Sequence, residues 1–319
     1  MGTQPSVHVY AGEEIARYGF GNVHPFGPDR FSAFWREFTK RGLQHKVQVN
    51  QPKQANQTDI ELFHTANYIT KVKTMSQTGS GYLDRGDTPC FPDAYQITAY
   101  VVGSVLDAIN NIILGSSRRA FVPIAGLHHA RRDSAAGFCI FNDCGIAIEA
   151  LRAQHGIQRV AYIDIDAHHG DGVFYAFEED PDLIFADLHE DGSYLYPGTG
   201  ARSETGKGAA KGSKLNIPMA PNADDQAFLS AWPEAEAFVR QAKPEFIILQ
   251  CGADSVAGDP LTHLQYSAKA HARAAQSLAQ IADTYCNGRM LAVGGGGYNR
   301  NNLAQAWCNV VEAMIPDGE

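Results

Sequence analysis

The stretch "YIDIDAHHGDG" at residues 162–172 decides how this chain is expected to fold. It starts inside the apolar, β-branched run 159–166, and a run of this kind bounded by polar residues is typical of a buried strand. The stretch then gathers acidic and imidazole side chains at Asp164, Asp166, His168, His169 and Asp171. Because alternate side chains of an extended strand share a face, Asp164, Asp166 and His168 are predicted to converge on one side.

Similar apolar runs recur along the chain and alternate with longer helical patterns. Further strands are predicted in "SVHVYAG" near the start and at 119–126, 183–189, 246–252 and 290–297. Helices are predicted at 94–113, 142–156, 223–242 and 267–285, some with Asp or Asn near their starts. This alternation predicts an α/β fold with a mostly parallel sheet and helices on both faces. No repeat or linker divides the chain, so we expect one domain over residues 1–319.

Polar clusters follow five of the predicted strands: "GLHHARRD", "DAHHGDG", "LHEDGSYLYPGTG", "GADSVAGD" and "GGGGYNRNN". In open α/β sheets, ligands bind beyond the carboxyl ends of the strands, so one sheet edge is expected to gather these clusters. The loops at 73–93 and 190–214, rich in Gly, Ser, Asp and Pro, are predicted to form the walls of a cleft.

Composition narrows the class of protein. The formal net charge of -9 argues against nucleic acid as the main partner and allows weak attraction of cationic substrates. No apolar run is long enough for a membrane span and no secretory signal is visible, so no membrane association is expected. The six cysteines include no C-x-x-C pair, which indicates reduced thiols in a cytoplasmic enzyme.

A divalent metal is the simplest explanation for the crowded strand end. Carboxylates gathered there would repel one another without a cation. Asp254, at the end of the strand predicted at 246–252, can join Asp166 and His168 as a third ligand. Such a set suits zinc, although its two oxygen donors leave iron(II) or manganese possible. The competing interpretation, surface charges or calcium-like ligation, is less favoured because the strand is predicted to be buried.

The adjacent His128 and His129 at another strand end suggest proton transfer near neutral pH. Each would need an orienting carboxylate, and Asp164 and Asp171 remain once Asp166 is assigned to the metal. Tyr298 follows four glycines, in a loop able to bring its hydroxyl toward the metal site. A glycine run more often forms a turn or an anion cradle, but a phosphate loop would require a following "GK[ST]".

These blocks together resemble the histone deacetylase family of zinc-dependent amidohydrolases, which includes bacterial acetoin-utilisation and acetylpolyamine relatives. The resemblance rests on "GLHHARRDSAAGFCIFND", "YIDIDAHHGDG", "LYPGTG", "GADSVAGDPL" and "GGGGYN", in this order and at these spacings. With "GFGNVHPFGPDR" and "FHTANYI", it covers nearly the whole chain. It implies the arginase-deacetylase fold, with about eight strands, and hydrolysis of N-acyl amides, foremost acetyl-lysine in proteins or peptides.

The resemblance also implies a role for each matching residue. The zinc ligands would be Asp166, His168 and Asp254. The catalytic residues would be His129 as general base and acid with its partner Asp171, His128 as a charged companion with its partner Asp164, and Tyr298 as a donor to the oxyanion. A structural potassium ion is implied near Asp164, Asp166, His168, Asp187 and Leu188. Asp187 stands where relatives carry serine, which changes the charge beside that cation site.

The same resemblance implies a narrow substrate channel. Its substrate-binding residues would be Gly137, Phe138, Tyr196, Leu261 and Gly296, with Asp87 holding the substrate backbone. Arg30 would line an inner cavity through which acetate leaves.

Three alternatives to an acyl-lysine deacetylase remain. An acetylpolyamine or other small cationic amide is kept open by Glu190 and Asp191, although the short 73–93 loop and Leu261 favour acyl-lysine. A binuclear manganese ureohydrolase would need further carboxylates where His128 and His129 stand. A non-catalytic acyl-lysine reader is disfavoured because every catalytic residue is present. The expected partners are thus an acetylated protein, peptide or small amide, and the sequence predicts no oligomeric state.

Overall fold

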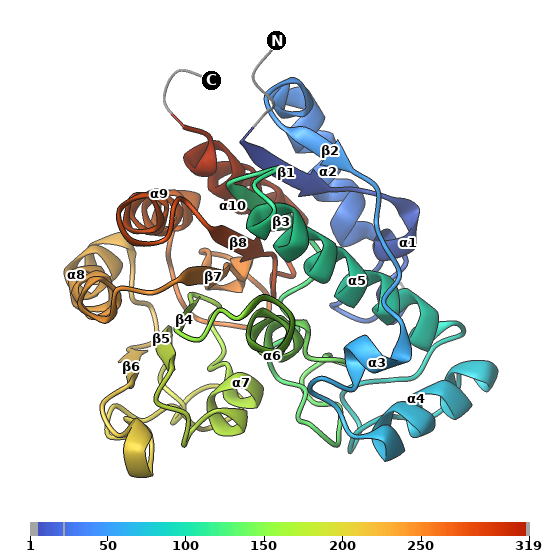
Figure 1. Ribbon diagram of the computed structural model, residues 1–319. Helices are drawn as coiled ribbons and strands as arrows, with labels where there is room; N and C mark the ends of the chain where they lie inside the picture. Colours follow the sequence, from blue (N-terminus) through green and yellow to red (C-terminus); the bar gives the residue numbers. More distant parts are fainter. Residues whose placement is uncertain (1–5, 22, 317–319) are drawn as a thin grey trace.

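The computed structural model describes residues 6–21 and 23–316 and contains one eight-stranded sheet (Figure 1). The strands are β1 (Val7–Tyr10), β2 (Gln48–Asn50), β3 (Arg119–Val122), β4 (Val160–Asp164), β5 (Leu183–Glu190), β6 (Lys214–Met219), β7 (Phe246–Gln250) and β8 (Met290–Val293). They lie in the order β2-β1-β3-β8-β7-β4-β5-β6, and every neighbouring pair is parallel. The predicted α/β fold with about eight strands is therefore confirmed.

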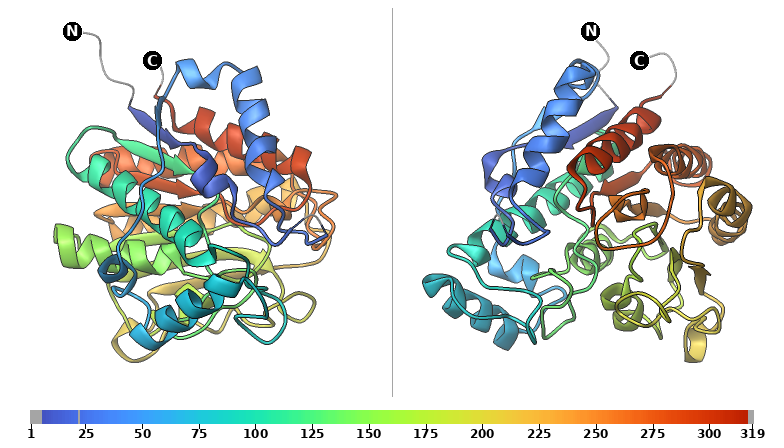
Figure 2. Two further views of the ribbon diagram at one scale, coloured as in Figure 1. Left: turned by 90° about the vertical axis from the view of Figure 1, so that its right-hand side faces the viewer. Right: turned by 180° about the vertical axis from the view of Figure 1, so that it is seen from behind.

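Helices cover both faces of the sheet. They are α1 (Glu13–Ala16), α2 (Asp29–Lys40), α3 (Gln57–Ile60), α4 (Ala66–Thr78), α5 (Ala94–Ile113), α6 (Asp143–His155), α7 (Asp171–Ala176), α8 (Asp225–Ala242), α9 (Ala268–Tyr285) and α10 (Arg300–Met314). Helices α2, α10, α9 and α8 pack successively in one layer, and α4, α5, α6 and α7 do so in another (Figures 1 and 2). The four predicted helices correspond to α5, α6, α8 and α9.

The strand register brings polar side chains together at one edge. Asp164, at the end of β4, pairs with Asp187 of β5 on one side and with Gln250 of β7 on the other. All residues of these three strands are buried, so the polar side chains at their carboxyl ends sit on an apolar base. This edge is where the sequence places the functional residues.

Three expectations about local structure need correction. Strand β4 ends at Asp164, so Asp166 and His168 belong to the following loop and strand alternation does not orient them. The expected loop 73–93 begins inside α4, which continues to Thr78. The expected loop 190–214 overlaps the last residue of β5 and the first residue of β6.

Two further expectations from composition can be compared with the structure. None of the described helices is both long and apolar enough to cross a bilayer. All six cysteines are buried and free, which agrees with the predicted reduced thiols.

Candidate metal centre and active site

Three side chains that lie far apart in the sequence form a compact buried group. Asp166 and His168 come from the loop after β4, and Asp254 comes from a short 3-10 turn (Ala253–Ser255) after β7. His168 Nδ1 lies 3.1 Å from Asp166 Oδ1 and 3.0 Å from Asp254 Oδ2. One ligand atom from each residue lies within 4.8 Å of the others, which suits a single metal ion.

The outer oxygens of both carboxylates are anchored by the protein. Asp166 Oδ2 accepts hydrogen bonds from the Gly296 amide at 2.8 Å and from Gln250 Nε2 at 3.0 Å. Asp254 Oδ1 accepts one from the Ala167 amide at 2.9 Å. These bonds turn the other oxygen of each carboxylate toward His168, as carboxylate ligands require before a metal binds.

The electrostatics of this group call for a cation. Burial and the nearby charge of Asp166 raise the pKa of Asp254 to about 7. Burial lowers the pKa of His168, but its hydrogen bonds to Asp166 and Asp254 outweigh this effect and raise the pKa to about 10. A proton therefore occupies the position between two carboxylates where a dication would bind. One nitrogen and two oxygen donors fit zinc.

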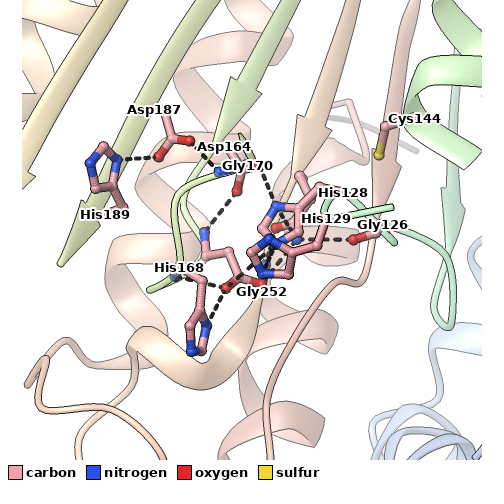
Figure 3. Close-up of polar contacts among 12 residues, drawn as sticks. Gly126, His128, His129, Cys144, Asp164, His168, Gly170, Asp187, His189 and Gly252 are labelled. Carbon is pink, nitrogen blue, oxygen red and sulfur yellow. Dashed lines mark hydrogen bonds and ion pairs between the residues drawn. The ribbon is translucent and has the colours of Figure 1, made fainter. Parts of the chain in front are cut away.

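Two neighbouring histidines lie beside the metal group, each held by a buried carboxylate. Figure 3 shows both histidines together with Asp164 and His168. His128 Nδ1 donates to Asp164 Oδ2 at 2.7 Å, and His129 Nδ1 donates to Asp171 Oδ1 at 2.7 Å. The two Nε2 atoms are 3.1 Å apart. Such a short contact requires one nitrogen to donate and the other to accept.

The pKa values assign the donor. Burial lowers the pKa of His128, but Asp164 and Asp166 raise it to about 10. Burial and the positive charge of His128 together lower the pKa of His129 to about 4, despite its bond to Asp171. Near neutral pH, His128 is therefore charged and donates to His129. The Nε2 of His129 therefore carries no proton of its own and accepts the hydrogen bond from His128.

The loop that carries these histidines is fixed by the start of α6. Asp143 accepts hydrogen bonds from the amides of Gly126 at 2.8 Å and Leu127 at 3.0 Å. Asn142 Nδ2 donates to the carbonyls of His128 at 3.2 Å and Ala130 at 2.8 Å. Asn142 and Asp143 were not among the predicted site residues. Their signal is the "ND" pair that begins the predicted helix at 142–156.

Gln250 is another site residue that sequence reasoning missed. Its Nε2 contacts Asp166, the Gly126 carbonyl and His128 Nδ1, the last at 3.3 Å. Its Oε1 accepts from the Gly252 amide at 2.7 Å. Gln250 thus links the metal group to the histidine loop. A polar residue ending the otherwise apolar "FIILQ" strand was the available signal.

Asp187 is buried, and both of its oxygens accept hydrogen bonds. Its Oδ1 is 2.7 Å from His189 Nδ1, and its Oδ2 accepts from the Gly170 amide at 2.9 Å (Figure 3). His189 Nε2 lies 3.0 Å from the Gly200 carbonyl, which can only accept, so both ring nitrogens donate and the ring is charged. Burial lowers the pKa of His189, but the charge of Asp187 outweighs this effect, so the pKa is raised overall. The negative charge of Asp187 is therefore matched by His189.

A cavity of about 220 Å³ leads to these groups. It is lined by Asp87, His129, Gly137, Phe138, His168, Leu195, Tyr196, Leu261 and Tyr298. The predicted channel residues other than Gly296 thus lie together, and Leu195 joins them. Gly296 lines a smaller inner pocket with Asp166, His168 and Tyr298.

Aromatic rings narrow this channel at its inner end. The Phe138 and Tyr298 ring centroids are 5.9 Å apart, and those of Tyr196 and His129 are 5.1 Å apart. Two glycines permit close packing beside them. A Cβ at Gly137 would lie 2.5 Å from His129 Cδ2, and one at Gly296 would collide with Asp254 Oδ2.

Arg30 is buried behind the inner pocket. Its Nε donates to the Gly297 carbonyl at 2.9 Å and its Nη2 to the Gly295 carbonyl at 2.6 Å. Its guanidinium also lies 4.0 Å from the centroid of the Phe26 ring. Arg30 supports the glycine run through these bonds and is not among the residues that line the inner pocket described above. Its expected role in acetate release stays a prediction.

The acidic side chains considered as a rim for cationic substrates are largely used within the protein. Glu190 is buried, and its two oxygens accept from the amide and Nδ1 of His263 at 2.8 and 2.7 Å. Asp191 Oδ1 accepts from the Ser193 amide at 2.8 Å. Glu190 therefore fastens the loop that carries Leu261 and offers no carboxylate to a polyamine.

The carboxyl edge of this parallel sheet holds a buried Asp-His-Asp group beside two histidines that are bound to carboxylates. This arrangement is typical of a metal-dependent hydrolase. The family model for the histone deacetylase domain matches residues 24–314. The chain is 35% identical to the acetoin utilization protein AcuC of Bacillus subtilis (strain 168), over 96% of this chain and 81% of that protein. It is 33% identical to histone deacetylase clr6 of Schizosaccharomyces pombe, over 94% of this chain and 75% of that protein.

Solved structures agree with these sequence matches. The crystal structure of the HDA15 HD domain superimposes with a TM-score of 0.89 and 27% identity, covering 97% of this chain and 89% of that chain. The chain belongs to the histone deacetylase family. The resemblance drawn from the sequence motifs is thereby confirmed.

Proposed function

We propose that this protein is a zinc-dependent deacetylase that hydrolyses acetyl-lysine in proteins or peptides. The observation that carries the proposal is the pairing of a neutral His129 with a charged His128 beside the Asp166, His168 and Asp254 group. A neutral imidazole with an unprotonated Nε2 is what a general base needs, and the attacking water would replace the hydrogen bond from His128. Its position at the inner end of a channel of about 220 Å³ places it where an acyl-lysine side chain would enter.

Asp166, His168 and Asp254 would hold zinc, although iron(II) fits the same donors. Zinc, when bound, supplies a Lewis acid that polarises the amide carbonyl and lowers the pKa of water from 15.7 to about 7. His129 Nε2 would take the proton of the attacking water, while Asp171 keeps the other ring proton on Nδ1. The same proton would then pass from His129 to the leaving amine, so the side chain ends the cycle neutral.

Two other groups would stabilise the negative charge that develops on the substrate oxygen. Tyr298 lines both the channel and the inner pocket, so its hydroxyl can donate to that oxygen. One such donor contributes on the order of 3 kcal/mol to transition-state stabilisation. His128 would contribute its charge, held in place by Asp164.

The channel favours an acyl-lysine over the alternatives. Phe138, Leu195 and Tyr196 offer apolar walls to an aliphatic stem, and the exposed Asp87 at the mouth can accept the substrate's backbone amides. Because Glu190 is buried against His263, the acetylpolyamine alternative loses one of the two rim carboxylates that supported it. A binuclear ureohydrolase is disfavoured because His128 and His129 occupy positions that further carboxylate ligands would need.

Three further assignments stay predictions. The single sheet supports one catalytic domain. A potassium ion near Asp164, Asp166, His168, Asp187 and Leu188 would have to bind beside an Asp187 carboxylate that already accepts two hydrogen bonds. Arg30 would act in acetate release from behind the inner pocket.

The proposal is tested by metal analysis together with turnover. We expect one zinc per chain and hydrolysis of a fluorogenic acetyl-lysine peptide, with slower hydrolysis of N-acetylated polyamines. Zinc-loaded protein that binds the peptide without turnover would identify a reader instead. Faster hydrolysis of acetylpolyamines than of every peptide would favour the small cationic amide as substrate.

A further inference from the structure

A second cavity adjoins the mouth of the substrate channel. It has a volume of about 560 Å³ and is lined by Asp84, Arg85, Gly86, Asp87, Arg131, Ser134, Ala135, Ala136 and Tyr196. Asp87 and Tyr196 also line the channel, so the two spaces meet at these residues. We call this second cavity the arginine groove.

The floor of the arginine groove is made of small side chains. The backbone of Arg131 pairs with that of Ser134, and the backbone of Ala136 pairs with that of Cys139. These pairings fold residues 131–139 back on themselves and present Ser134, Ala135 and Ala136 to the groove. Such a floor leaves room for an extended peptide that continues from a lysine inserted in the channel.

Two guanidinium groups border this space and remain available to a ligand. Arg85 is exposed and makes no ion pair with any described residue. The Arg131 side chain is 63% exposed, and its Nη2 lies 3.6 Å from the buried Asp171 Oδ2. That separation is longer than a hydrogen bond, so the N–H groups of the guanidinium remain able to donate to a ligand.

The two acidic residues of the groove have hydrogen-bonding roles other than pairing with Arg85 and Arg131. Asp84 Oδ1 accepts from the amides of Gly86, Asp87 and Thr88, each at 2.9 Å, and its Oδ2 accepts from Thr88 Oγ1 at 2.6 Å. Asp84 is therefore used to shape the turn. Asp87 is the acceptor proposed above for the substrate's backbone amides. After both are engaged, the donors of Arg85 and Arg131 are left for substrate side chains.

We propose that the arginine groove binds a carboxylate of the substrate and makes the enzyme prefer acetyl-lysine with an acidic neighbour. This inference rests on the proposed deacetylase function and names its substrate class. A peptide advances at most about 3.6 Å per residue, so a carboxylate one or two residues from the acetyl-lysine can reach a groove that adjoins the channel mouth. Guanidinium groups bind carboxylates through paired hydrogen bonds.

Two sources could supply the carboxylate, and matched peptides separate them. One series carries Glu, Gln or Lys at each of the two positions on either side of acetyl-lysine, with both peptide ends blocked. A second series ends in acetyl-lysine, with its α-carboxyl group either free or amidated. The readout is kcat/KM for each peptide at low and at high salt concentration.

We expect the Glu peptide to exceed its Gln counterpart by roughly 3- to 10-fold in kcat/KM at one or more positions, as for partly exposed charge pairs. The Lys peptide should fall below both. The preference should shrink at high salt because mobile ions screen exposed charges. A preference confined to the free α-carboxyl series would assign the groove to a chain end rather than to an acidic side chain.

Variants tie the preference to the groove. Arg85→Gln should reduce the Glu/Gln ratio of kcat/KM severalfold, and Arg85→Glu should reverse it in favour of Lys. The ratio is used because it cancels any change in the chemical step, which matters for Arg131→Gln since Arg131 contacts Asp171. Arg36→Gln is the matched control, because Arg36 is an exposed residue of α2 that does not line the groove.

The outcomes distinguish this inference from the proposed function. Equal kcat/KM for Glu, Gln and Lys peptides at every position, with free and amidated ends alike, would overturn the inference while leaving a working deacetylase. A Glu preference that survives in Arg85→Gln and Arg131→Gln would overturn it too. If no acetyl-lysine peptide is hydrolysed, the proposed function fails, and fluorescence anisotropy of the same labelled peptides still decides whether the groove binds a carboxylate.

Discussion

Acidification should destabilise this protein through one buried histidine that supports the active-site loop. His64 is 2% exposed, and its Nε2 accepts a hydrogen bond from the Asn142 amide at 2.8 Å. Its Nδ1 lies 3.3 Å from the Arg132 carbonyl, an acceptor, so Nδ1 carries the proton and Nε2 carries none. Burial lowers the pKa of His64 to about 3, which keeps the folded ring neutral.

The size of the effect follows from proton linkage. In the unfolded chain the histidine pKa returns to about 6.5, so the unfolded state binds a proton below that pH while the folded state does not. The contribution of the neutral His64 to the free energy of unfolding is therefore fully present above about pH 6.5. It is lost as the pH falls from there toward about 3. Between pH 8 and pH 5 the loss is 2.303RT times about 1.5, or about 2 kcal/mol.

The assay is urea unfolding of the wild type and of His64→Gln at pH 8 and pH 5, with zinc removed from both by a chelator. The glutamine amide can still accept from Asn142 without titrating, so His64→Gln should lose about 2 kcal/mol less than the wild type over this pH range. His45→Gln, at an exposed histidine, serves as control. Equal losses in the wild type and in His64→Gln would refute the assignment of a neutral, proton-excluding His64.

Four substitutions test the proposed catalytic roles. Asp254→Ala should abolish tight zinc binding and lower the thermal stability of the metal-loaded protein, and an unchanged zinc stoichiometry would contradict its role as a ligand. Tyr298→Phe should keep zinc and the fold but reduce turnover by roughly 100-fold, whereas near-parental turnover would remove the phenol from the mechanism. His129→Ala should reduce turnover by roughly 100- to 10,000-fold while peptide binding persists. His128→Ala should reduce turnover less than His129→Ala does. It should also raise the pKa that limits activity on the acidic side, because the charge that lowers the pKa of His129 is lost. A larger loss of turnover in His128→Ala than in His129→Ala would transfer the base role to His128.

Much of the site could be predicted because parallel strands carry it. Apolar runs in the sequence predicted β3, β4, β5, β7 and β8 and showed where each strand ends. The carboxyl ends of adjacent parallel strands lie at the same edge of the sheet. The polar residues after each run are therefore brought together without any knowledge of side-chain packing. Resemblance to family motifs then implied roles that topology alone could not assign.

The outer strands were missed because their patterns are weak. Strand β2 has only three residues, none of them buried, so its sequence carries no apolar run. Strand β6, "KLNIPM", contains a lysine, an asparagine and a proline, and proline within a sheet is tolerated mainly at an edge. The structure shows why Lys214 can begin this strand: its buried Nζ donates to the carbonyls of Asp180 and Leu183, each at 2.8 Å.

Residues whose role is to position other side chains could also not be predicted from the sequence. Gln250 and Asp143 bind no expected ligand themselves, so chemical reasoning about metals and proton transfer gave no cause to choose them. Their importance lies in the distances from Gln250 to Asp166 and from Asp143 to the Gly126 amide. Such contacts depend on how loops from different strands pack, which a strand pattern does not specify.

The balance of buried charge locates the metal independently of any motif. Carboxylates at the carboxyl edge of the sheet need nearby positive charge, since an uncompensated buried ion is very costly. Three of them lie beside a cation: Asp164 is 2.7 Å from His128, Asp187 is 2.7 Å from His189, and Asp171 is 3.6 Å from Arg131. Asp166 and Asp254 instead share the Nδ1 proton of His168. Among the described residues of this edge, the compensating charge is thus least complete between these two carboxylates, and a dication that displaces the His168 proton would complete it.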